Sequence, residues 1–215
     1  LSAHLAEPFL DIHPEDAQAL SIVPADLVRV SSPAGQAILR ARVTASVQPG
    51  QVFAPMHWTA QTAPSARIDA LVAAACDPVS GQPESKASVV ALRRFEAAWY
   101  GFAVSRDEMH LDSDYWALAR TKQGYRAEMA GMAHVTDWEA KARALFGANG
   151  TALSSVIDAN KGRVRIVAHQ GETLIGALFV SSEPVAVMRD YLATLPGTGG
   201  ADALLGRPAG YVPNP

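Results

Sequence analysis

The sequence predicts a mainly β protein with a smaller α+β part, and three observations lead to that fold class. Up to about residue 95, short apolar runs are separated by turn residues and enclose one helical pattern. Beyond that point, strand patterns alternate with helical ones, and no internal repeat occurs. Of the 215 residues, 49% are hydrophobic and 18% are charged, so the chain can bury a sizeable core. We therefore expect two domains, spanning residues 1–95 and 96–215.

The first domain is expected to be a small β-barrel whose strands each follow a turn signal. Its helix should begin at Pro14, because proline suits the first helical turn, and Glu15 and Asp16 complement the positive end of the helix dipole. The expected strands are residues 8–12, 27–31, 37–44, 52–54 and 88–95.

The segment 47–86 does not fit either regular pattern. After the apolar run at 52–54, it is rich in prolines and polar residues, and helical spacing returns only at 68–75, where we expect a short helix over 70–75. A loop of this length inside a compact domain is usually functional or disordered, and its aromatic and apolar content argues against disorder. It is interpreted as an ordered, ligand-facing loop, with a long packed crossover as the alternative.

The second domain is expected to be α+β. A helix over 137–146 should be capped by Thr136 and ended by Gly147, and Gly171 and Glu172 form the turn of a hairpin. A second helix, over 184–195, precedes a tail rich in glycine and proline. The expected strands are residues 97–104, 124–131, 154–158, 162–168 and 173–180, with 115–121 as either a strand or a helix.

Composition and spacing exclude several classes of protein. The net charge of −3 provides no basic surface for nucleic acid, and no apolar run is long enough to span a membrane. The single cysteine, Cys76, excludes an internal disulfide, and we expect a buried, unreactive thiol in a reducing compartment, the cytoplasm. No histidines stand at metal-ligand spacing, and no nucleophile has an identifiable base. We therefore predict no catalytic and no metal-ligating residue here.

Three blocks within the irregular segment carry a resemblance to a known family. They are APMHW (54–58), ARIDALV (66–72) and DPVSGQPESK (77–86), and their order and spacing are those of the C-terminal dinucleotide-binding domain of molybdopterin oxidoreductases. The chain looks most like bacterial assimilatory nitrate reductases. RVRIV (163–167) and LIGALFV (174–180) resemble the region that follows this domain in that subgroup. LLGRP (204–208) resembles the run that precedes its cysteine-rich iron–sulfur segment.

This resemblance implies a double-psi β-barrel that closes one side of a molybdopterin guanine dinucleotide site. The implied parent reaction is the molybdenum-dependent reduction of nitrate to nitrite. Because the chain begins with Leu1 rather than methionine, we expect a fragment of a longer polypeptide. The metal ligand and a [4Fe–4S] cluster would belong to the missing part, so we expect the fragment to be inactive alone and to bind no cofactor. The implied partners are the upstream domains of the same polypeptide and an electron-donor reductase, not nucleic acid or a membrane.

The resemblance places eight cofactor-binding residues in this segment: Met56, His57, Trp58, Thr59, Arg67, Asp69, Gln82 and Lys86. His57 could hydrogen-bond the edge of a pterin, and the indole of Trp58 could supply flat contact. From the residues alone, a histidine at the end of a strand and a tryptophan packed in the core are the favoured alternatives. Arg67 could bind a diphosphate through bidentate contacts, or it faces solvent as most arginines do.

The remaining candidates also have two interpretations each. Where the family usually carries asparagine, this chain has Asp69, a carboxylate that accepts but does not donate hydrogen bonds at neutral pH. We favour Asp69 as the cap of the helix over 70–75. The amide of Gln82, held by the following Pro83, suits a pterin or guanine edge. Lys86 would pair with an anionic group or is a surface residue.

Two further functions stay open at this stage. The same barrel occurs in molybdopterin oxidoreductases with other substrates, such as formate dehydrogenases. A barrel of this type can also be a non-catalytic module for protein interaction, with the second domain as a docking surface.

Overall fold

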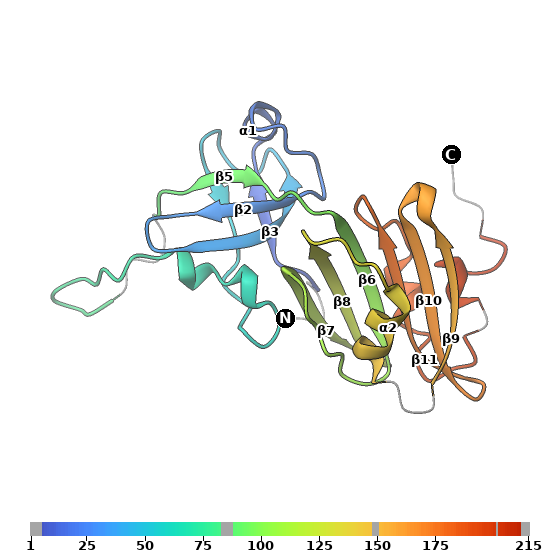
Figure 1. The fold of residues 1–215 in the computed structure, drawn as a ribbon. Coiled ribbons are helices and arrows are strands. Elements are labelled where there is room, and N and C mark those ends of the chain that lie inside the picture. The colour runs from blue at the N-terminus through green and yellow to red at the C-terminus, as the bar shows by residue number, and fades with distance from the viewer. Residues whose placement is uncertain (1–5, 83–87, 148–150, 201, 212–215) are drawn as a thin grey trace. The chain divides into compact units, whose positions relative to one another are not determined.

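The computed structural model describes residues 6–82, 88–147, 151–200 and 202–211 (Figure 1). These residues divide into two compact units, of which the first ends at Glu96 and the second begins at Ala97. In both units the regular elements are mainly strands, which confirms the predicted fold class of a mainly β chain with an α+β part. In the described residues, no helix is long and apolar enough to cross a membrane.

Unit 1 contains a five-stranded mixed sheet with the order β4-β1-β3-β2-β5 (Figure 1). β1 pairs with β3 in parallel, and every other pair of neighbouring strands is antiparallel. The sheet corresponds to half of a barrel, and the double-psi crossing stays a prediction. The bounds are β1 Phe9–Ile12, β2 Leu27–Ser31, β3 Gln36–Val43, β4 Val52–Phe53 and β5 Ala91–Arg94, close to the predicted ranges.

The predicted helix at Pro14 is present as α1 (Pro14–Ala19). His13 is its cap, because its Nδ1 accepts a hydrogen bond from the backbone N–H of Glu15 at 3.3 Å. The carboxylate of Asp16 accepts a hydrogen bond from the backbone N–H of Gly50 at 2.7 Å. This bond fastens the turn before β4 to the helix.

Two buried carboxylates lie at the ends of strands in unit 1. Asp11 in β1 accepts hydrogen bonds from Nε and one terminal nitrogen of Arg42, whose guanidinium lies 3.8 Å from the centre of the Phe9 ring. Asp26 accepts from the backbone N–H of Val23 at 2.9 Å and pairs with Arg94 of β5 at 3.3 Å. Because a buried charge needs a partner, these pairs fix β3 and β5, the strands that precede and follow the irregular segment.

The irregular segment contains two short 3₁₀ helices, η1 (Pro64–Ala66) and η2 (Ile68–Leu71). The predicted α-helix over 70–75 is wrong. The hydroxyl of Ser32 donates to the carbonyl of Leu71 at 2.8 Å, so that carbonyl is held by the β2–β3 turn rather than by a following helical N–H. The alanines at 73–75 are exposed and bury nothing that would extend a helix.

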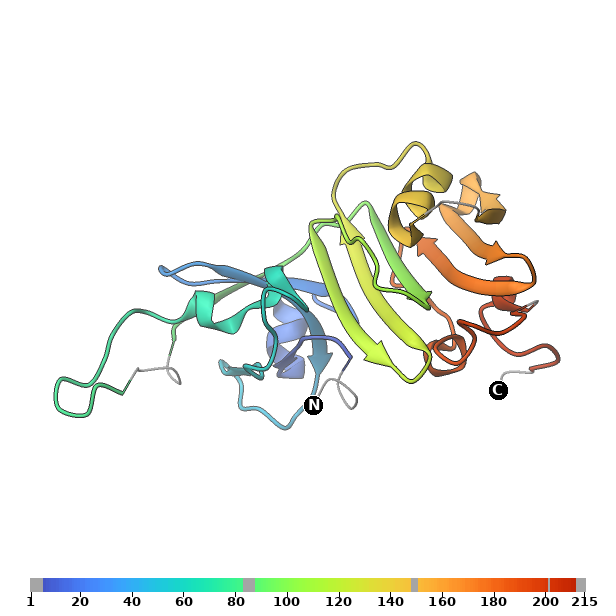
Figure 2. The ribbon, with the colours of Figure 1, turned by 90° about the horizontal axis from the view of Figure 1, so that it is seen from below.

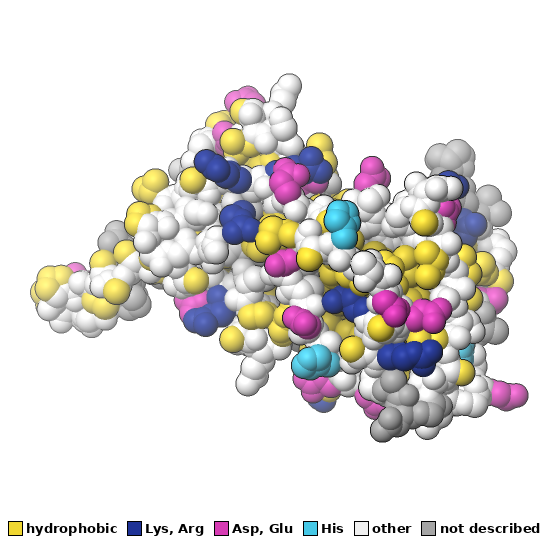
Figure 3. Space-filling model, in the orientation of Figure 1, with side chains coloured by type: hydrophobic (Ala, Val, Ile, Leu, Met, Phe, Trp, Pro, Cys, Tyr) yellow, Lys and Arg dark blue, Asp and Glu magenta, His cyan; other side chains and the backbone are white. Residues whose placement is uncertain are grey.

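Beyond Val72, the chain extends away from the sheet of unit 1 as a loop (Figures 1 and 2). The carboxylate of Asp77 accepts hydrogen bonds from the backbone N–H groups of Val79 and Ser80 at 3.0 and 2.6 Å, so the loop has its own turn. Hydrophobic side chains lie at its tip (Figure 3), and Val79 is 94% exposed. Cys76 is exposed as well, so the prediction of a buried thiol is wrong. Its alanine neighbours stand in the loop rather than in a packed helix.

Unit 2 contains a six-stranded antiparallel sheet with the order β7-β8-β6-β11-β10-β9. Residues 115–121 form a strand, which decides between the two predicted alternatives. Helix α2 (Trp138–Phe146) lies on one face, and the C-terminal segment lies on the other (Figure 2). The strands are β6 Trp99–Ser105, β7 Tyr115–Thr121, β8 Gly124–Gly131, β9 Ala152–Asp158, β10 Arg163–Gln170 and β11 Thr173–Ser181.

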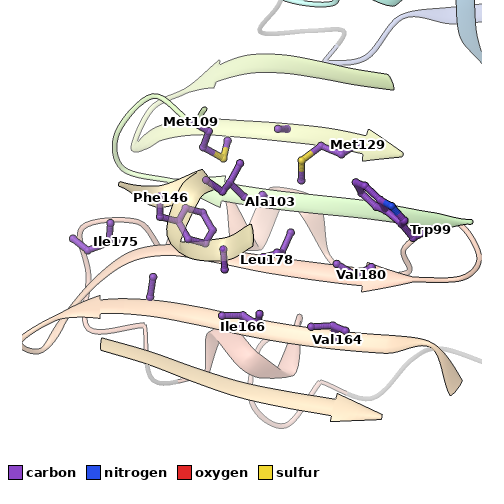
Figure 4. Close-up of a cluster of buried hydrophobic side chains, with 14 of the residues drawn as sticks. Trp99, Ala103, Met109, Met129, Phe146, Val164, Ile166, Ile175, Leu178 and Val180 are labelled. Carbon is purple, nitrogen blue, oxygen red and sulfur yellow. The ribbon is translucent and has the colours of Figure 1, made fainter. Parts of the chain in front are cut away.

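The core between α2 and the sheet contains side chains from β6, β8, β10 and β11 (Figure 4). Phe146 packs where Gly176 has no side chain, since a Cβ there would lie 2.5 Å from the ring. The predicted cap of α2 is wrong by one residue: the carboxylate of Asp137, not Thr136, accepts from the N–H of Ala140 at 2.8 Å. The predicted stop at Gly147 is confirmed by its left-handed backbone, with φ of 69°.

The second predicted helix is much shorter than expected. Only α3 (Arg189–Leu192) is helical within 184–195. The guanidinium of Arg189 donates to the carboxylate of Glu128 at 2.6 Å and to the carbonyl of Val185 at 3.0 Å. These bonds hold the preceding residues along the sheet, where Val185 is buried, so they do not enter a helix.

Candidate functional site

The irregular segment forms two neighbouring hollows on unit 1. The larger, which we call the apolar cleft, has a volume of about 690 Å³, and the smaller, which we call the polar pocket, has a volume of about 250 Å³. Met56 and Ile68 line both, so the hollows adjoin. The apolar cleft is lined by Leu10, Val30, Leu39, residues 52–57, Ile68, Leu71, Val72, Ser88 and Val90, and the polar pocket by Met56, Trp58, Thr59, Ala60, Arg67, Ile68 and Asp69.

Most of the eight candidate residues meet here. Five of them line the polar pocket: Met56, Trp58, Thr59, Arg67 and Asp69. His57 lines the apolar cleft, so it lies next to the pocket. Gln82 is exposed on the loop beyond Val72 and lines neither hollow. Lys86 lies outside the described residues.

The turn at 59–63 positions the first wall of the polar pocket. The backbone N–H of Thr59 donates to the hydroxyl of Thr62 at 3.2 Å, and the N–H of Ala63 donates to the carbonyl of Thr59 at 2.9 Å. Ala63 and Ala66 have no exposed surface, so the turn and η1 are anchored by packing. Thr59 is thereby held at the surface, in the pocket wall.

Trp58 is half-buried rather than packed in the core, so it differs from the alternative that the residues alone favoured. Its indole meets the ring of Phe9 edge-on, with 6.5 Å between ring centres. The same Phe9 ring lies against Arg42, which the buried Asp11 holds in place. The strand β1 therefore orients the indole and leaves part of it open to the pocket. His57 is exposed beside it.

Arg67 and Asp69 form a bidentate ion pair on the other wall of the polar pocket. The hydrogen bond from Arg67 is the main cause that lowers the pKa of Asp69 below its ordinary value, and the same bond raises the pKa of Arg67. Both groups are therefore charged at neutral pH. The side chains are 43% and 62% exposed, so the pair faces solvent.

Asp69 does not cap a helix, so that part of the prediction is wrong. It lies inside η2, whose preceding residue is Arg67, and no side chain caps that helix. The reason is that no helix follows Leu71 in the described part of the loop, and the carboxylate pairs with the guanidinium two residues earlier.

The polar pocket offers both kinds of hydrogen-bonding group to a ligand. A guanidinium carries five N–H groups, and Asp69 uses two of those of Arg67, so the others can bind an anion. The carboxylate of Asp69 can accept from the N–H groups of a heterocycle. Within the described residues, no three or more histidine, cysteine, aspartate or glutamate side chains are grouped to hold a metal ion.

The sequence interpretation missed most of the apolar cleft. Its walls include Phe53 at the end of β4, Val72 after η2, and Val90 before β5. Phe53 is 53% exposed although it stands in an apolar run. The sequence carries no local signal for this cleft, because Val52, Phe53 and Ala54 all line it and its other walls come from distant elements.

Comparisons with known proteins agree with the blocks in the irregular segment. Residues 2–89 match the model of the molydopterin dinucleotide binding domain. The chain is 37% identical over 139 residues to a nitrate reductase of Klebsiella oxytoca, which covers 64% of this chain and 16% of that protein. It is 31% identical over 90 residues to the assimilatory nitrate reductase catalytic subunit of Bacillus subtilis, covering 42% and 12%.

A third relative is named for a different activity. The chain is 35% identical over 94 residues to the F420-dependent formate dehydrogenase subunit alpha of Methanocaldococcus jannaschii, which covers 44% of this chain and 13% of that protein. The chain thus spans less than a fifth of the length of each of these relatives. The match to the molydopterin dinucleotide binding domain thus covers most of unit 1 and less than half of the chain.

Proposed function

We propose that unit 1 binds molybdopterin guanine dinucleotide and that the chain works as part of a molybdenum-dependent nitrate reductase. The observation that carries this proposal is the polar pocket, where four candidate residues from two of the three family-like blocks meet, together with the adjacent Thr59, around one hollow. The family match over residues 2–89 supports the cofactor class. In such an enzyme, the cofactor supplies the redox chemistry, and the protein binds and orients it.

The longest of these three matches favours nitrate over formate as the substrate of the whole protein. The match to the formate dehydrogenase covers 94 residues, which is about the length of unit 1. The match to the Klebsiella nitrate reductase covers 139 residues, so it extends into unit 2. This longer likeness, which includes unit 2, supports the proposal of a nitrate reductase. We also propose a cytoplasmic enzyme that receives electrons from a separate reductase.

The described residues fit the chemical groups of this cofactor. Arg67 provides N–H groups in the planar arrangement that suits a phosphate, and Asp69 keeps that cation in place while it accepts from ring N–H groups. Trp58 and Met56 supply apolar contact for a flat heterocycle, and the apolar cleft beside them is large enough for a bulky one. His57, Gln82 and Lys86 complete the proposed set, with Gln82 contributed by the exposed loop.

The test is Arg67→Met in the whole enzyme. We expect the variant to lose most of its bound molybdenum and phosphate, measured by elemental analysis, together with nitrate reduction by a chemical electron donor. The control is Arg93→Gln, an exposed arginine of β5 that lines neither hollow. If Arg67→Met kept its full cofactor content, the polar pocket would not be the site that binds the cofactor. If the unmodified enzyme oxidised formate and did not reduce nitrate, formate would replace nitrate as the proposed substrate.

A further inference from the structure

One edge of the sheet in unit 2 is formed by a strand that has a neighbour on one side only. β9 (Ala152–Asp158) is the outermost strand, and in the described residues it pairs with β10 alone (Figure 1). It follows β10 in antiparallel register over its whole length, without a bulge. On the outer side of such a strand, backbone N–H and C=O groups point away from the sheet, so β9 offers a row of donors and acceptors to another strand.

The other three sheet edges of the described chain have features that hinder pairing with another strand. β4 is only two residues long, β5 ends in the exposed Arg93 and Arg94, and β7 carries the exposed Arg120. β9 differs, because it is seven residues long and contains no lysine, arginine or proline. Its single charged residue is Asp158, at its end. This difference indicates that β9 is an edge at which pairing can occur.

The side chains of β9 expose apolar surface on both faces of this edge. Ile157 stands opposite Val164 of the core, on the face that α2 covers, and is 53% exposed. Leu153 lies on the same face and packs against the core. Val156 lies on the other face and is 55% exposed. An added strand would cover these groups, because residues of paired strands stand directly opposite each other.

We propose that β9 pairs with the β9 of a second copy of this chain, antiparallel and about a two-fold axis at Ser155. All seven residues then stand opposite a residue of the other copy. Leu153 of each copy faces Ile157 of the other, so two apolar contacts join the cores of the two copies on the face that α2 covers. One strand thus supplies both halves of the contact, which is the self-complementarity that a two-fold interface requires.

The charges near β9 are compatible with this register. Asp158 faces Ala152 of the other copy, so the carboxylates of the two strands do not stand opposite each other. A like-charge approach comes from α2, because Ser155 donates a hydrogen bond to the carboxylate of Glu139 at 2.6 Å, and the axis places both copies of Glu139 on one face. This bond lies at the exposed surface, so salt should screen the repulsion and strengthen the dimer.

The test is the mass of the 215-residue chain, measured by sedimentation equilibrium. A contact built on one strand pair is smaller than the ~1,200 Å² at which standard interfaces begin, so we expect a reversible dimer with a Kd on the order of 10 µM. Higher salt and Glu139→Gln should each lower this Kd about twofold, because both reduce the repulsion across the axis.

Two double variants test the register. In Ser154→Lys with Val156→Lys, a lysine of each copy faces a lysine of the other at both positions, so the Kd should rise about tenfold. Ser154→Glu with Val156→Glu should weaken the dimer in the same way. An equimolar mixture of the two variants should form a heterodimer, because each lysine then faces a glutamate. Both positions are exposed, so circular dichroism should show both variants folded.

The control is Gln18→Lys with Gln123→Lys, which adds the same charge at exposed positions outside β9 and should leave the Kd unchanged. A chain that stays monomeric up to about tenfold above the expected Kd, an unchanged Kd in the lysine variant of β9, or a mixture that forms no heterodimer would each overturn the proposal. Slow hydrogen exchange of the β9 amides in a monomeric whole enzyme would also overturn it, since another segment would then cover this edge.

Discussion

In each unit of this protein a β-sheet is covered by other parts of the chain, and the covering elements differ between the units. In unit 2, long antiparallel strands are covered by α2 on one face and by the C-terminal segment on the other. In unit 1, the strands are shorter and an irregular segment with two 3₁₀ helices lies over them, which leaves two adjoining hollows. Regular elements exclude solvent efficiently, whereas irregular backbone leaves space and exposes polar groups at defined points.

Each unit contains arginine–carboxylate pairs, and two of them, one from each unit, differ in burial. Glu128 in β8 is 3% exposed, and its bonds to Arg189 join the sheet to the segment that covers it. Asp69 is 62% exposed in its side chain, and its pair with Arg67 faces the polar pocket. A buried pair is costly to break, whereas an exposed one contributes little to stability. The first pair is therefore structural, and the second is available to a ligand.

The largest loss of stability is expected when a side-chain atom is added to the closely packed core of unit 2. In Gly176→Ala, the new Cβ would lie 2.5 Å from the ring of Phe146 and 2.9 Å from the carbonyl of Val104. Neither neighbour can move freely, so we expect a loss of about 3 kcal/mol in the free energy of unfolding, measured in urea. Gly199→Ala is the control, because its Cβ would have no neighbour closer than 3.9 Å. Equal stability of the two variants would show that the sheet and α2 are loosely packed.

A smaller loss is expected when the buried pair is broken. Arg189→Leu removes two hydrogen bonds from the carboxylate of Glu128. Because the side chain of Arg189 is 32% exposed, the loss should fall below that of a fully buried pair, at about 2 kcal/mol. Hydrogen exchange should rise in residues 184–206 and stay unchanged in unit 1. Protection that is unchanged in that segment would mean that the pair does not hold it to the sheet.

The sequence was sufficient to predict the strands of both units because their signals are local. Turn residues delimit β2 and β3, and the hairpin of β10 and β11 follows from Gly171 and Glu172 between two apolar runs. The end of α2 was predicted for the same reason, since Gly147 can adopt the left-handed conformation that stops a helix.

The features that were not predicted depend on distant contacts. The hydroxyl of Ser32 stops the helix expected after Leu71, and Glu128 holds Arg189 so that the last helix is short. Neither partner is near in sequence. The blocks of the irregular segment located most of the polar pocket, but Phe53 and Val90 became part of a cleft only through the sheet. The exposure of Cys76 follows from the loop leaving the core, which an alanine-rich sequence does not reveal.

Removal of the contact that fixes η2 should lower the stability of unit 1 moderately. In Ser32→Ala, the carbonyl of Leu71 loses its donor, and two backbone N–H groups of the β2–β3 turn lose their acceptor. We expect unit 1 to lose about 1 kcal/mol of stability and hydrogen exchange to rise at 68–72. Ser46→Ala, at an exposed turn, is the matched control. If Ser46→Ala lowered the stability of unit 1 and Ser32→Ala did not, η2 would be held by packing alone.

The smallest effect on stability, and the sharpest contrast between the two pairs, is expected from Asp69→Asn. The lowered pKa of Asp69 means that its pair stabilises the fold above the ordinary pKa of an aspartate, and that this contribution is lost as the pH falls through the lowered value. Both side chains are exposed, so solvent screens the pair, and the stability of the variant should equal that of the unmodified chain between about pH 5 and pH 8. Its cofactor content in the whole enzyme should nevertheless fall. A variant that lost stability at neutral pH with its cofactor content intact would make this pair a structural one, like that of Glu128 and Arg189, and the distinction between the two pairs would disappear.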